Sequence, residues 1–580
     1  MQSIFIYYAS FLCLLSQLVR GQSIDPLNNF CKRIDHQTVI KNGKLYIDGG
    51  LQAFVENNWD GAHDGNITVG YNKYLIEIDM SESWDWKKNL STVALNKTEN
   101  PDTGSNPPQV VRGALYAGRP NYNKIYLYGG TTSLRNTSFP GWLPQSSAQY
   151  TLWSYDTVTK EWDQYDVSDA APLRPTSGAY AEAPEQGLAF YFNGQIDQGS
   201  AVNTQLLGPA KRFLKGMIAI DTNNQTARNI STDLVVADYP RTRGKMAYLP
   251  GAGEKGILAI LGGSSKHVED NSDKTTGQYV PMDEVIIFDI NSLYNGDNNE
   301  TWYKQKVTGA IPEPRIDFCL VAISAPDNSS HNIYMYGGRD STSVFDDIYI
   351  LSVPSFTWTR IYQGQSPRAY HTCHVAGNRQ MITIGGDKTT KIEEGCDWET
   401  KSVAVYDLTE LKWGSVFNAK AAPYEVPKQL SKTIGGGAQG RADITAPKDG
   451  FQQKGLAQLF GQQLDDSEPT PPDVSKGITG GAIAGIVIGV IAAFAMVSGG
   501  IFFVYRRRRG QNDLKPQGGP FNSHPAELLA PHEAKPQTYE LPPNTRPVEL
   551  PGEAIAELPP SYQIIDSTDR SDDGDNAGNR

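Results

Sequence analysis

The stretch Asn332-Ile-Tyr-Met-Tyr-Gly337-Gly338 decides the fold, because runs of the same kind recur along the chain. Each run is a short apolar segment, typical of a β-strand, that ends in two glycines. The other copies are Lys44–Gly50, Lys124–Gly130, Gly256–Gly263 and Gln380–Gly386, with a degenerate copy at Leu188–Gly194 in which Asn193 replaces the first glycine. Their second glycines lie 48 to 80 residues apart, a spacing that predicts one small sheet per copy.

Each copy is flanked by further extended segments, so we expect six units of four antiparallel strands. A tyrosine in the third expected strand is followed by a tryptophan in the fourth; these pairs are Tyr155 with Trp162, Tyr349 with Trp358 and Tyr406 with Trp413. No tryptophan follows Ile218-Ala-Ile, so the third unit should be the least regular. An arginine often opens the first strand, at Arg112, Arg174, Arg243, Arg315 and Arg368.

This combination of a double glycine, a tyrosine and a tryptophan in successive strands resembles the kelch repeat. The resemblance covers about residues 25–427, and it implies an all-β fold, a six-bladed kelch-type β-propeller. The glycines and tryptophans are expected to be structural, because the rings fill the space between neighbouring sheets. We place the propeller at residues 22–427 and expect residues 25–33 to latch the ring.

Insertions between the second and third strands should all emerge on one face of the propeller. They span residues 51–72, 131–151, 195–214, 264–283, 339–346 and 387–401, and five of the six are long. Long loops on a rigid scaffold are where recognition usually takes place. The candidate binding residues are Trp59, Trp142, Tyr150, Arg339, Asp340 and Trp398. The alternative is that these loops are solvated and bind no ligand.

Glycosylation acceptors and cysteines indicate an oxidising, extracellular environment. Asn-x-Ser/Thr occurs at Asn66, Asn89, Asn96, Asn136, Asn224, Asn229, Asn299 and Asn328. Apart from Cys13, four cysteines remain, and an even number favours disulfides. We expect a Cys373–Cys396 disulfide, because these two lie in one unit, which leaves Cys31 and Cys319 either bonded or free. No Cys-x-x-Cys spacing suggests a metal site.

Two apolar segments predict secretion and anchoring. Residues 1–21 are typical of a signal peptide cleaved after Gly21, although no basic residue precedes the apolar core, so an uncleaved anchor is the alternative. Residues 477–505 contain 29 residues without a charge, enough for a transmembrane helix. Arg506–Arg509 follow directly, which predicts a single-pass type I protein of the plasma membrane with its N-terminus outside.

The membrane segment also suggests a partner. Four glycines recur every four residues at Gly477, Gly481, Gly485 and Gly489. They would leave one helix face without bulk, where a second copy of the chain could pack to form a homodimer.

The segments on either side of the membrane helix lack a strand pattern. Residues 428–476 are rich in Gly, Gln and Pro and are expected to form a flexible stalk. Residues 506–580 are expected to be a disordered cytoplasmic tail. The tail contains Pro559-Pro560-Ser-Tyr562, which resembles the ligand of WW domains, so a WW-domain ubiquitin ligase or adaptor is the expected partner.

The net charge of −12 argues against nucleic-acid binding. The layout from signal to tail resembles the kelch-repeat membrane proteins of filamentous fungi. The sequence therefore predicts a surface glycoprotein whose propeller binds an extracellular protein or a cell-wall glycan, with no cofactor. The alternative is a secreted enzyme resembling galactose oxidase, whose copper site needs two histidines. His371 and His374 are three residues apart on an expected strand, so they should face opposite sides.

Overall fold

A computed structural model of the chain describes residues 25–55, 67–132, 150–171, 173–270, 276–295 and 301–462. All of these residues belong to one compact unit, Met1–Glu468. The predicted signal peptide (1–21), membrane helix (477–505) and tail (506–580) lie outside the described residues. Among the helices that the structure does describe, none has the length and apolar character needed to cross a bilayer.

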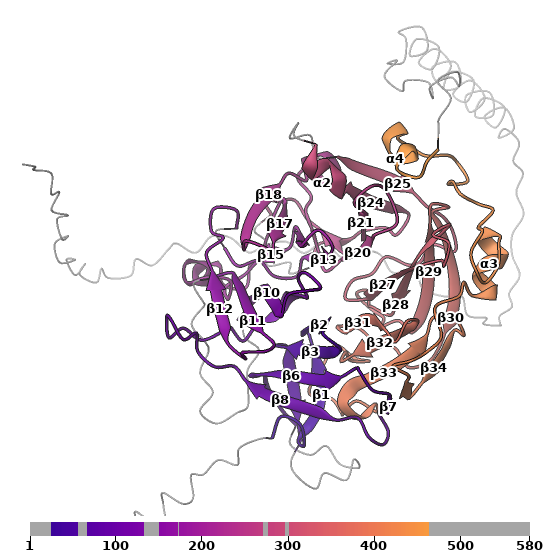
Figure 1. Cartoon of the computed structure of the whole chain (residues 1–580). Coiled ribbons are helices and arrows are strands. Elements are labelled where there is room, and N and C mark those ends of the chain that lie inside the picture. Colours follow the sequence, from indigo (N-terminus) through magenta and orange to yellow (C-terminus); the bar gives the residue numbers. More distant parts are fainter. Residues whose placement is uncertain are drawn as a thin grey trace, which may run out of the picture. The chain divides into compact units, whose positions relative to one another are not determined.

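Six sheets of four or five strands follow one another along the chain, each with its main strands antiparallel and in chain order (Figure 1). Sheet 1 contains β2 (Gln37–Lys41), β3 (Lys44–Asp48), β6 (Tyr74–Asp79) and β8 (Thr92–Asn96), and sheet 2 contains β9 (Val111–Tyr116), β10 (Lys124–Thr131), β11 (Leu152–Asp156) and β12 (Trp162–Tyr165). Sheet 3 contains β13 (Ala179–Ala183), β14 (Leu188–Phe192), β17 (Met217–Asp221) and β18 (Thr226–Ile230), and sheet 4 contains β20 (Lys245–Leu249), β21 (Ile257–Leu261), β24 (Glu284–Asp289) and β25 (Trp302–Lys306). Sheet 5 contains β27 (Cys319–Ser324), β28 (His331–Tyr336), β29 (Asp347–Val353), β30 (Thr357–Gln363) and a parallel edge strand, β26 (Thr308–Gly309). Sheet 6 contains β31 (Thr372–Ala376), β32 (Gln380–Ile384), β33 (Val403–Asp407) and β34 (Lys412–Gly414).

Short elements complete the described part. The insertions and edges form two small three-stranded sheets, one of β1 (Phe30–Ile34), β4 (Leu51–Phe54) and β5 (Thr68–Tyr71), and one of β19 (Arg241–Thr242), β22 (Ser264–Ser265) and β23 (Gln278–Tyr279). They also form two strand pairs, β15 (Gln195–Ile196) with β16 (Arg212–Phe213), and β7 (Trp84–Asp85) with β35 (Val416–Phe417). The helical segments are η1 (Val202–Leu207), α2 (Asp233–Val236), η2 (Ile290–Tyr294), η3 (Thr400–Ser402), α3 (Lys428–Ile434) and α4 (Lys454–Leu459).

Hydrophobic clusters fill every junction between consecutive sheets, including the junction between sheet 6 and sheet 1. Strand β21, Ile-Leu-Ala-Ile-Leu, is buried at all five positions, because its sheet packs between two others. The first strands also contact one another in a cycle, from β2 through β9, β13, β20, β27 and β31 back to β2. The described sheets therefore form a closed, propeller-like ring.

The aromatic pairs expected from the sequence meet between adjacent strands. Ring centroids are 5.1 Å apart for Tyr155 and Trp162, 4.9 Å for Tyr406 and Trp413, and 6.2 Å for Tyr349 and Trp358. Trp162 and Trp358 are buried, whereas Trp413 is half-buried. These rings form part of the clusters between the sheets, which confirms the structural role predicted for them.

Both glycines of the repeated pair have positive φ, for example 63° at Gly337 and 92° at Gly338. A Cβ atom on Gly337 would collide with the carbonyl oxygen of Arg368 ahead of the next sheet, so the close approach of two sheets requires glycine. In the degenerate copy, Asn193 takes φ 50°. Its amide donates hydrogen bonds to the carbonyl of Gly216 (3.0 Å) and the hydroxyl of Thr232 (3.2 Å). Asparagine tolerates this conformation, so the turn is kept.

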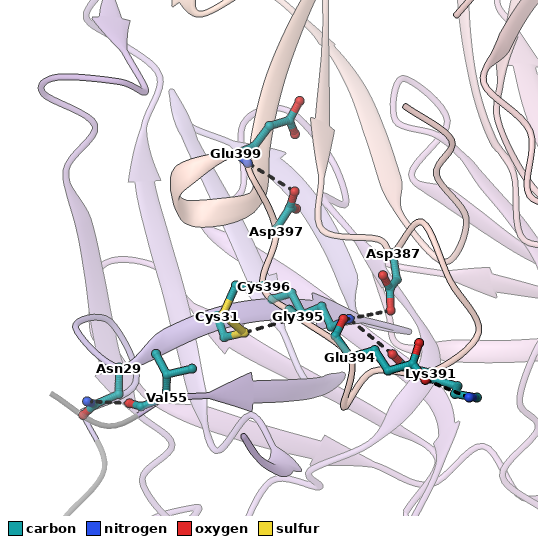
Figure 2. Close-up of a disulfide and its surroundings, with 11 residues drawn as sticks. Asn29, Cys31, Val55, Asp387, Lys391, Glu394, Gly395, Cys396, Asp397 and Glu399 are labelled. Atoms are coloured by element: carbon teal, nitrogen blue, oxygen red, sulfur yellow. Dashed lines mark hydrogen bonds and ion pairs between the residues drawn. A yellow bond between two sulfur atoms is a disulfide. The ribbon is translucent and has the colours of Figure 1, made fainter. Parts of the chain in front are cut away.

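The N-terminal segment joins sheet 6 to sheet 1, as expected for the latch. Cys31 in β1 forms a disulfide with Cys396 in the insertion of sheet 6, and the Cα atoms are 4.7 Å apart (Figure 2). Next to it, Lys32 Nζ lies 2.8 Å from the carboxylate of Asp387 in a buried ion pair. At the outer edge, β7 pairs with β35, which follows sheet 6. The ring is thus closed by a covalent bond as well as by strand pairing.

The predicted Cys373–Cys396 disulfide is wrong. Cys396 bonds to Cys31, and Cys373 in β31 bonds to Cys319 in β27, with Cα atoms 5.9 Å apart. The prediction assumed that cysteines of one unit lie closest together. In a ring of sheets, however, first strands of neighbouring units lie side by side, whereas Cys373 and Cys396 are in the first strand and the insertion of one unit. Both disulfides therefore connect different elements of the ring.

The flexible stalk predicted from residue 428 is also wrong for residues 428–462. Leu430 and Ile434 of α3 are buried in the cluster between sheets 5 and 6, and Leu456 of α4 is buried between sheets 4 and 5. The backbone N–H of Lys306 donates to the Gln452 side chain at 2.6 Å. A few apolar residues thus suffice to pack this low-complexity segment on the outer strands. Residues 463–476 lie outside the described part.

Candidate functional site

One residue at the start of each sheet has a left-handed backbone conformation. These six residues, which we call the mouth ring, are Asp35, Arg112, Ser177, Arg243, Asp317 and Tyr370, with φ between 57° and 65°. Each backbone N–H donates to the carbonyl of the preceding member, and Asp35 closes the cycle by donating to Tyr370, at 2.7 to 3.3 Å. A non-glycine residue in this region costs about 1 kcal/mol or more. Such strain is often concentrated at functional sites.

Charged side chains of the mouth ring pair with one another. Arg112 lies 2.8 Å from the carboxylate of Asp35. Asp317 is shared by Arg243 (3.5 Å) and by Arg339 (3.0 Å), a residue of the insertion in sheet 5. Burial acts to raise the pKa of Asp35, but the guanidinium groups of Arg112, Arg243 and Arg339 together lower it below its usual value. The Asp35 carboxylate is therefore held in its charged form.

A cavity of about 540 Å³, here called the mouth cavity, borders this ring. Every one of the six insertions predicted to share a face contributes to its lining, through Leu51, Thr131, Asp197, Lys211, Thr276, Arg339, Ser341 and Thr390. The prediction that these loops gather on one face is therefore confirmed for the described residues. The volume is within the range of small-ligand and peptide side-chain pockets.

Cations outnumber carboxylates around the mouth cavity. The cavity is lined by four cationic side chains, Arg112, Lys211, Arg243 and Arg339, and by two carboxylates, Asp35 and Asp197. A third carboxylate, Asp317, pairs with Arg243 and Arg339. Lys211 forms no side-chain hydrogen bond or ion pair with any residue that the structure describes. Burial, together with Arg112 and Arg243, lowers the pKa of Lys211 to about 8. The three neighbouring carboxylates leave one cationic group in excess, and this group can accept an anionic group of a ligand.

The opposite side of the ring has a cavity of about 500 Å³ with a different character. Burial raises the pKa of Glu182 in this cavity to about 7. Both of its oxygens already accept hydrogen bonds at 3.0 Å, from the backbone N–H groups of Ala117 and Gly118. This carboxyl group joins two sheets, so the cavity offers less unused polar chemistry than the mouth cavity.

The structure separates the binding residues predicted from the sequence. Arg339 lines the mouth cavity, and Trp398 lies on a different groove. Asp340 holds its own turn by accepting hydrogen bonds from the N–H groups of Thr342 (2.7 Å) and Ser343 (2.6 Å). Tyr150 packs against the cluster between sheets 1 and 2. Trp59 and Trp142 lie outside the described residues.

Four of the five arginines that open the units occupy two kinds of position. Arg112 and Arg243 belong to the mouth ring, whereas Arg315 and Arg368 lie two residues before it. Arg315 donates to the carbonyl of Gly337 (3.1 Å), and Arg368 donates to that of Gly385 (2.7 Å). The latter two therefore hold the glycine turns.

Sequence reasoning missed Asp35, Asp317, Tyr370 and Lys211. A signal was present for the first three. In four units the mouth-ring residue follows an arginine by two positions, in Arg33-Ile-Asp35, Arg241-Thr-Arg243, Arg315-Ile-Asp317 and Arg368-Ala-Tyr370. Lys211 carries no comparable signal, because it lies in an insertion without a repeat.

The histidines considered for an oxidase do not form a common ligand set. The ring of His371 contacts that of Tyr336, with centroids 5.0 Å apart, whereas His374 Nε2 lies 2.7 Å from the Thr38 hydroxyl. Burial lowers the pKa of both imidazoles, to about 4 for His374. Across the described ranges, no three His, Cys, Asp or Glu side chains gather as a potential metal site.

The glycosylation acceptors that the structure describes are accessible. Asn89, Asn96, Asn224, Asn229 and Asn328 are exposed, and none of them lines the mouth cavity. Asn66, Asn136 and Asn299 lie outside the described residues. Whether any acceptor carries a glycan remains a prediction.

Comparison with known proteins agrees with this architecture. Residues 275–432 match the KLHDC2/KLHL20/DRC7 Kelch-repeats domain family. A Kelch repeat-containing protein of Arthroderma benhamiae is 28% identical over 83% of this chain and 75% of its own length. Residues 275–432 thus match kelch repeats, and the chain is similar to kelch-repeat proteins. The kelch resemblance expected from the double glycines is thereby confirmed.

Other similarities are more distant. Kelch domain-containing protein 1 of Homo sapiens is 21% identical over 48% of this chain and 63% of its own length. Among solved structures, that of YjhT is 15% identical, and the match covers 68% of this chain and 100% of that one, with a TM-score of 0.42.

Proposed function

We propose that this chain is a binding module whose mouth cavity receives an acidic group of a protein ligand. The observation that carries the proposal is the excess of one cation over the neighbouring carboxylates, in a cavity to which all six insertions contribute. Arg112, Arg243 and Arg339 are held in place by ion pairs with Asp35 and Asp317. Lys211 has no such pair among the described residues, so it is the cation most available to a ligand carboxylate.

The proposed scaffold is a six-bladed propeller. Six sheets, six junction clusters and the cycle of first strands all support this assignment. A ring held by a disulfide and by the Lys32–Asp387 ion pair would keep the insertions in fixed positions. Rigid presentation lowers the entropy lost when a ligand binds.

We further propose that the module faces the extracellular side of the plasma membrane as a type I glycoprotein. The 29-residue apolar segment, the four arginines after it and the exposed acceptors support this topology. Two disulfides fit a secretory route. The tail motif Pro559-Pro560-Ser-Tyr562 would then be available to cytosolic WW-domain adaptors, and the glycine face of the helix to a second copy.

The ligand chemistry is tested by selecting peptides from a displayed random library on the full-length chain purified in mild detergent. We expect the wild type to enrich acidic peptides, and Lys211→Glu to lose them. The matched control is Lys420→Glu, which changes an exposed lysine outside the mouth cavity by the same charge. Selection of non-acidic peptides, or equal binding by the Lys211 variant, would contradict the proposal.

The topology is tested on intact cells. Added protease should cleave the propeller side and spare the tail epitope, and glycosidase should lower the apparent mass. Cleavage of the tail with protection of the propeller would contradict the proposed orientation.

A further inference from the structure

A second cavity lies apart from the mouth cavity and has a different chemistry. Its volume is about 260 Å³, and no residue lines both cavities. Five aromatic side chains surround it, which we call the aromatic groove: Trp86, Tyr336, Tyr362, Trp398 and Trp413. Sheets 5 and 6 supply Tyr336, Tyr362 and Trp413, the insertion of sheet 6 supplies Trp398, and Trp86 comes from the segment that follows β7.

The aromatic rings contact one another in two sets. Trp413 contacts Tyr336 at 4.9 Å and Tyr362 at 6.3 Å between centroids, and Trp86 meets Trp398 edge to face at 5.8 Å. Trp86 is buried, but Trp398 is 63% exposed. The Trp398 ring packs against Trp86 and is still open to solvent, so a ligand can stack on it.

Buried polar groups line the same groove. The Glu399 side chain is only 6% exposed, and its Oε2 accepts no hydrogen bond from the described residues. Arg368 lies 3.0 Å from this oxygen as an ion-pair partner. Burial raises the pKa of Glu399 to about 7. The ion pair gives this oxygen a charged neighbour, and a ligand hydroxyl could supply the hydrogen bond that it lacks.

The charges already present favour an uncharged ligand. Arg368 is paired with both Asp397 and Glu399. Lys87 Nζ lies 5.3 Å from the centre of the Trp86 ring, so a cation of this chain already occupies that aromatic face. A cationic ligand would have to displace Arg368 from its carboxylates or Lys87 from the Trp86 ring. An added anion would meet the carboxylates of Glu399 and Asp346.

We propose that the aromatic groove binds a neutral saccharide. A pyranose ring has an apolar C–H face that can lie against Trp398 and hydroxyl groups that can donate to Glu399. The volume is suited to one or two sugar rings rather than to a folded partner. This inference does not depend on the protein ligand proposed for the mouth cavity.

The test uses saturation-transfer difference NMR and calorimetry on the full-length chain in mild detergent. The probes are cellotriose, mannotriose and N-acetylated chitotriose, with a trimethyllysine peptide as the cationic competitor. At least one trisaccharide should receive saturation at its ring C–H protons. Trp398→Ala should weaken that binding about tenfold or more, as is usual for a central aromatic contact. Trp398→Phe should restore part of it.

Tyr122→Ala is the matched control, because Tyr122 is an exposed aromatic residue that does not line the groove. This variant should bind like the wild type. The proposal is overturned if no trisaccharide binds or if binding survives Trp398→Ala. It is also overturned if the trimethyllysine peptide binds in place of the sugars with the same dependence on Trp398.

Discussion

Removing the Cys31–Cys396 disulfide should destabilise the ring more than removing Cys319–Cys373. The first disulfide joins residues 365 apart in sequence and the second joins residues 54 apart. In the chain-entropy treatment, loss of a crosslink costs about 6 kcal/mol for the longer loop and about 4 kcal/mol for the shorter one. The difference of about 1.7 kcal/mol depends only on the ratio of the two loop lengths.

The assay is urea unfolding under non-reducing conditions, followed by tryptophan fluorescence. One protein carries Cys31→Ala with Cys396→Ala, and its matched control carries Cys319→Ala with Cys373→Ala. Both should unfold at lower urea than the wild type, and the first should unfold at the lower concentration of the two. If the first pair costs no more than the control pair, the latch adds nothing to β7–β35 pairing and the reasoning is refuted.

Two further predictions concern the glycine turns and a buried acid. Gly337→Ala should destabilise the fold by about 3 kcal/mol, because the added methyl group meets the Arg368 carbonyl and φ is positive. The control, Gly395→Ala, is also at positive φ but has no atom within 4 Å of the added Cβ, so it should cost about 1 kcal/mol. Equal midpoints of the two variants in urea unfolding would contradict the steric argument. Burial raises the pKa of Glu399 from 4.5 to about 7, so the folded state keeps a proton that the unfolded chain releases, and wild-type stability should fall as pH rises through this window. Between pH 4.5 and 7, the free energy of unfolding of the wild type should fall by about 3 kcal/mol more than that of Glu399→Gln. Parallel curves of unfolding free energy against pH for the two proteins would show that Glu399 does not cause the fall.

The repeat made most of the fold predictable from sequence. Positions such as Gly337-Gly338 and Trp358 report local requirements, namely a backbone turn and a space between sheets, and these recur in every unit. Even the exception at Asn193 keeps the turn, because asparagine can adopt the same φ.

Contacts between units could not be predicted in the same way. The pairing of Cys31 with Cys396 depends on how the ring closes, which no local pattern encodes. The packing of Leu430 and Leu456 was missed because a few apolar residues in a polar segment give no periodicity.

The candidate site was predictable in its location but not in its composition. The shared face of the insertions followed from the strand order, and Arg339 lies there. Lys211 was not predicted, because its importance comes from the charges of Arg112 and Arg243, which lie far from it in sequence. Trp398 was predicted as a binding residue of the shared face, but it lines a separate groove.

Photocrosslinking of a selected acidic peptide to the full-length chain tests the central claim most directly. A peptide with a photoreactive phenylalanine beside its acidic residue should attach to the insertions around the mouth cavity, such as the segments containing Lys211 and Arg339. Attachment to the opposite hairpins, such as the segment from Glu182 to Glu185, would contradict the account.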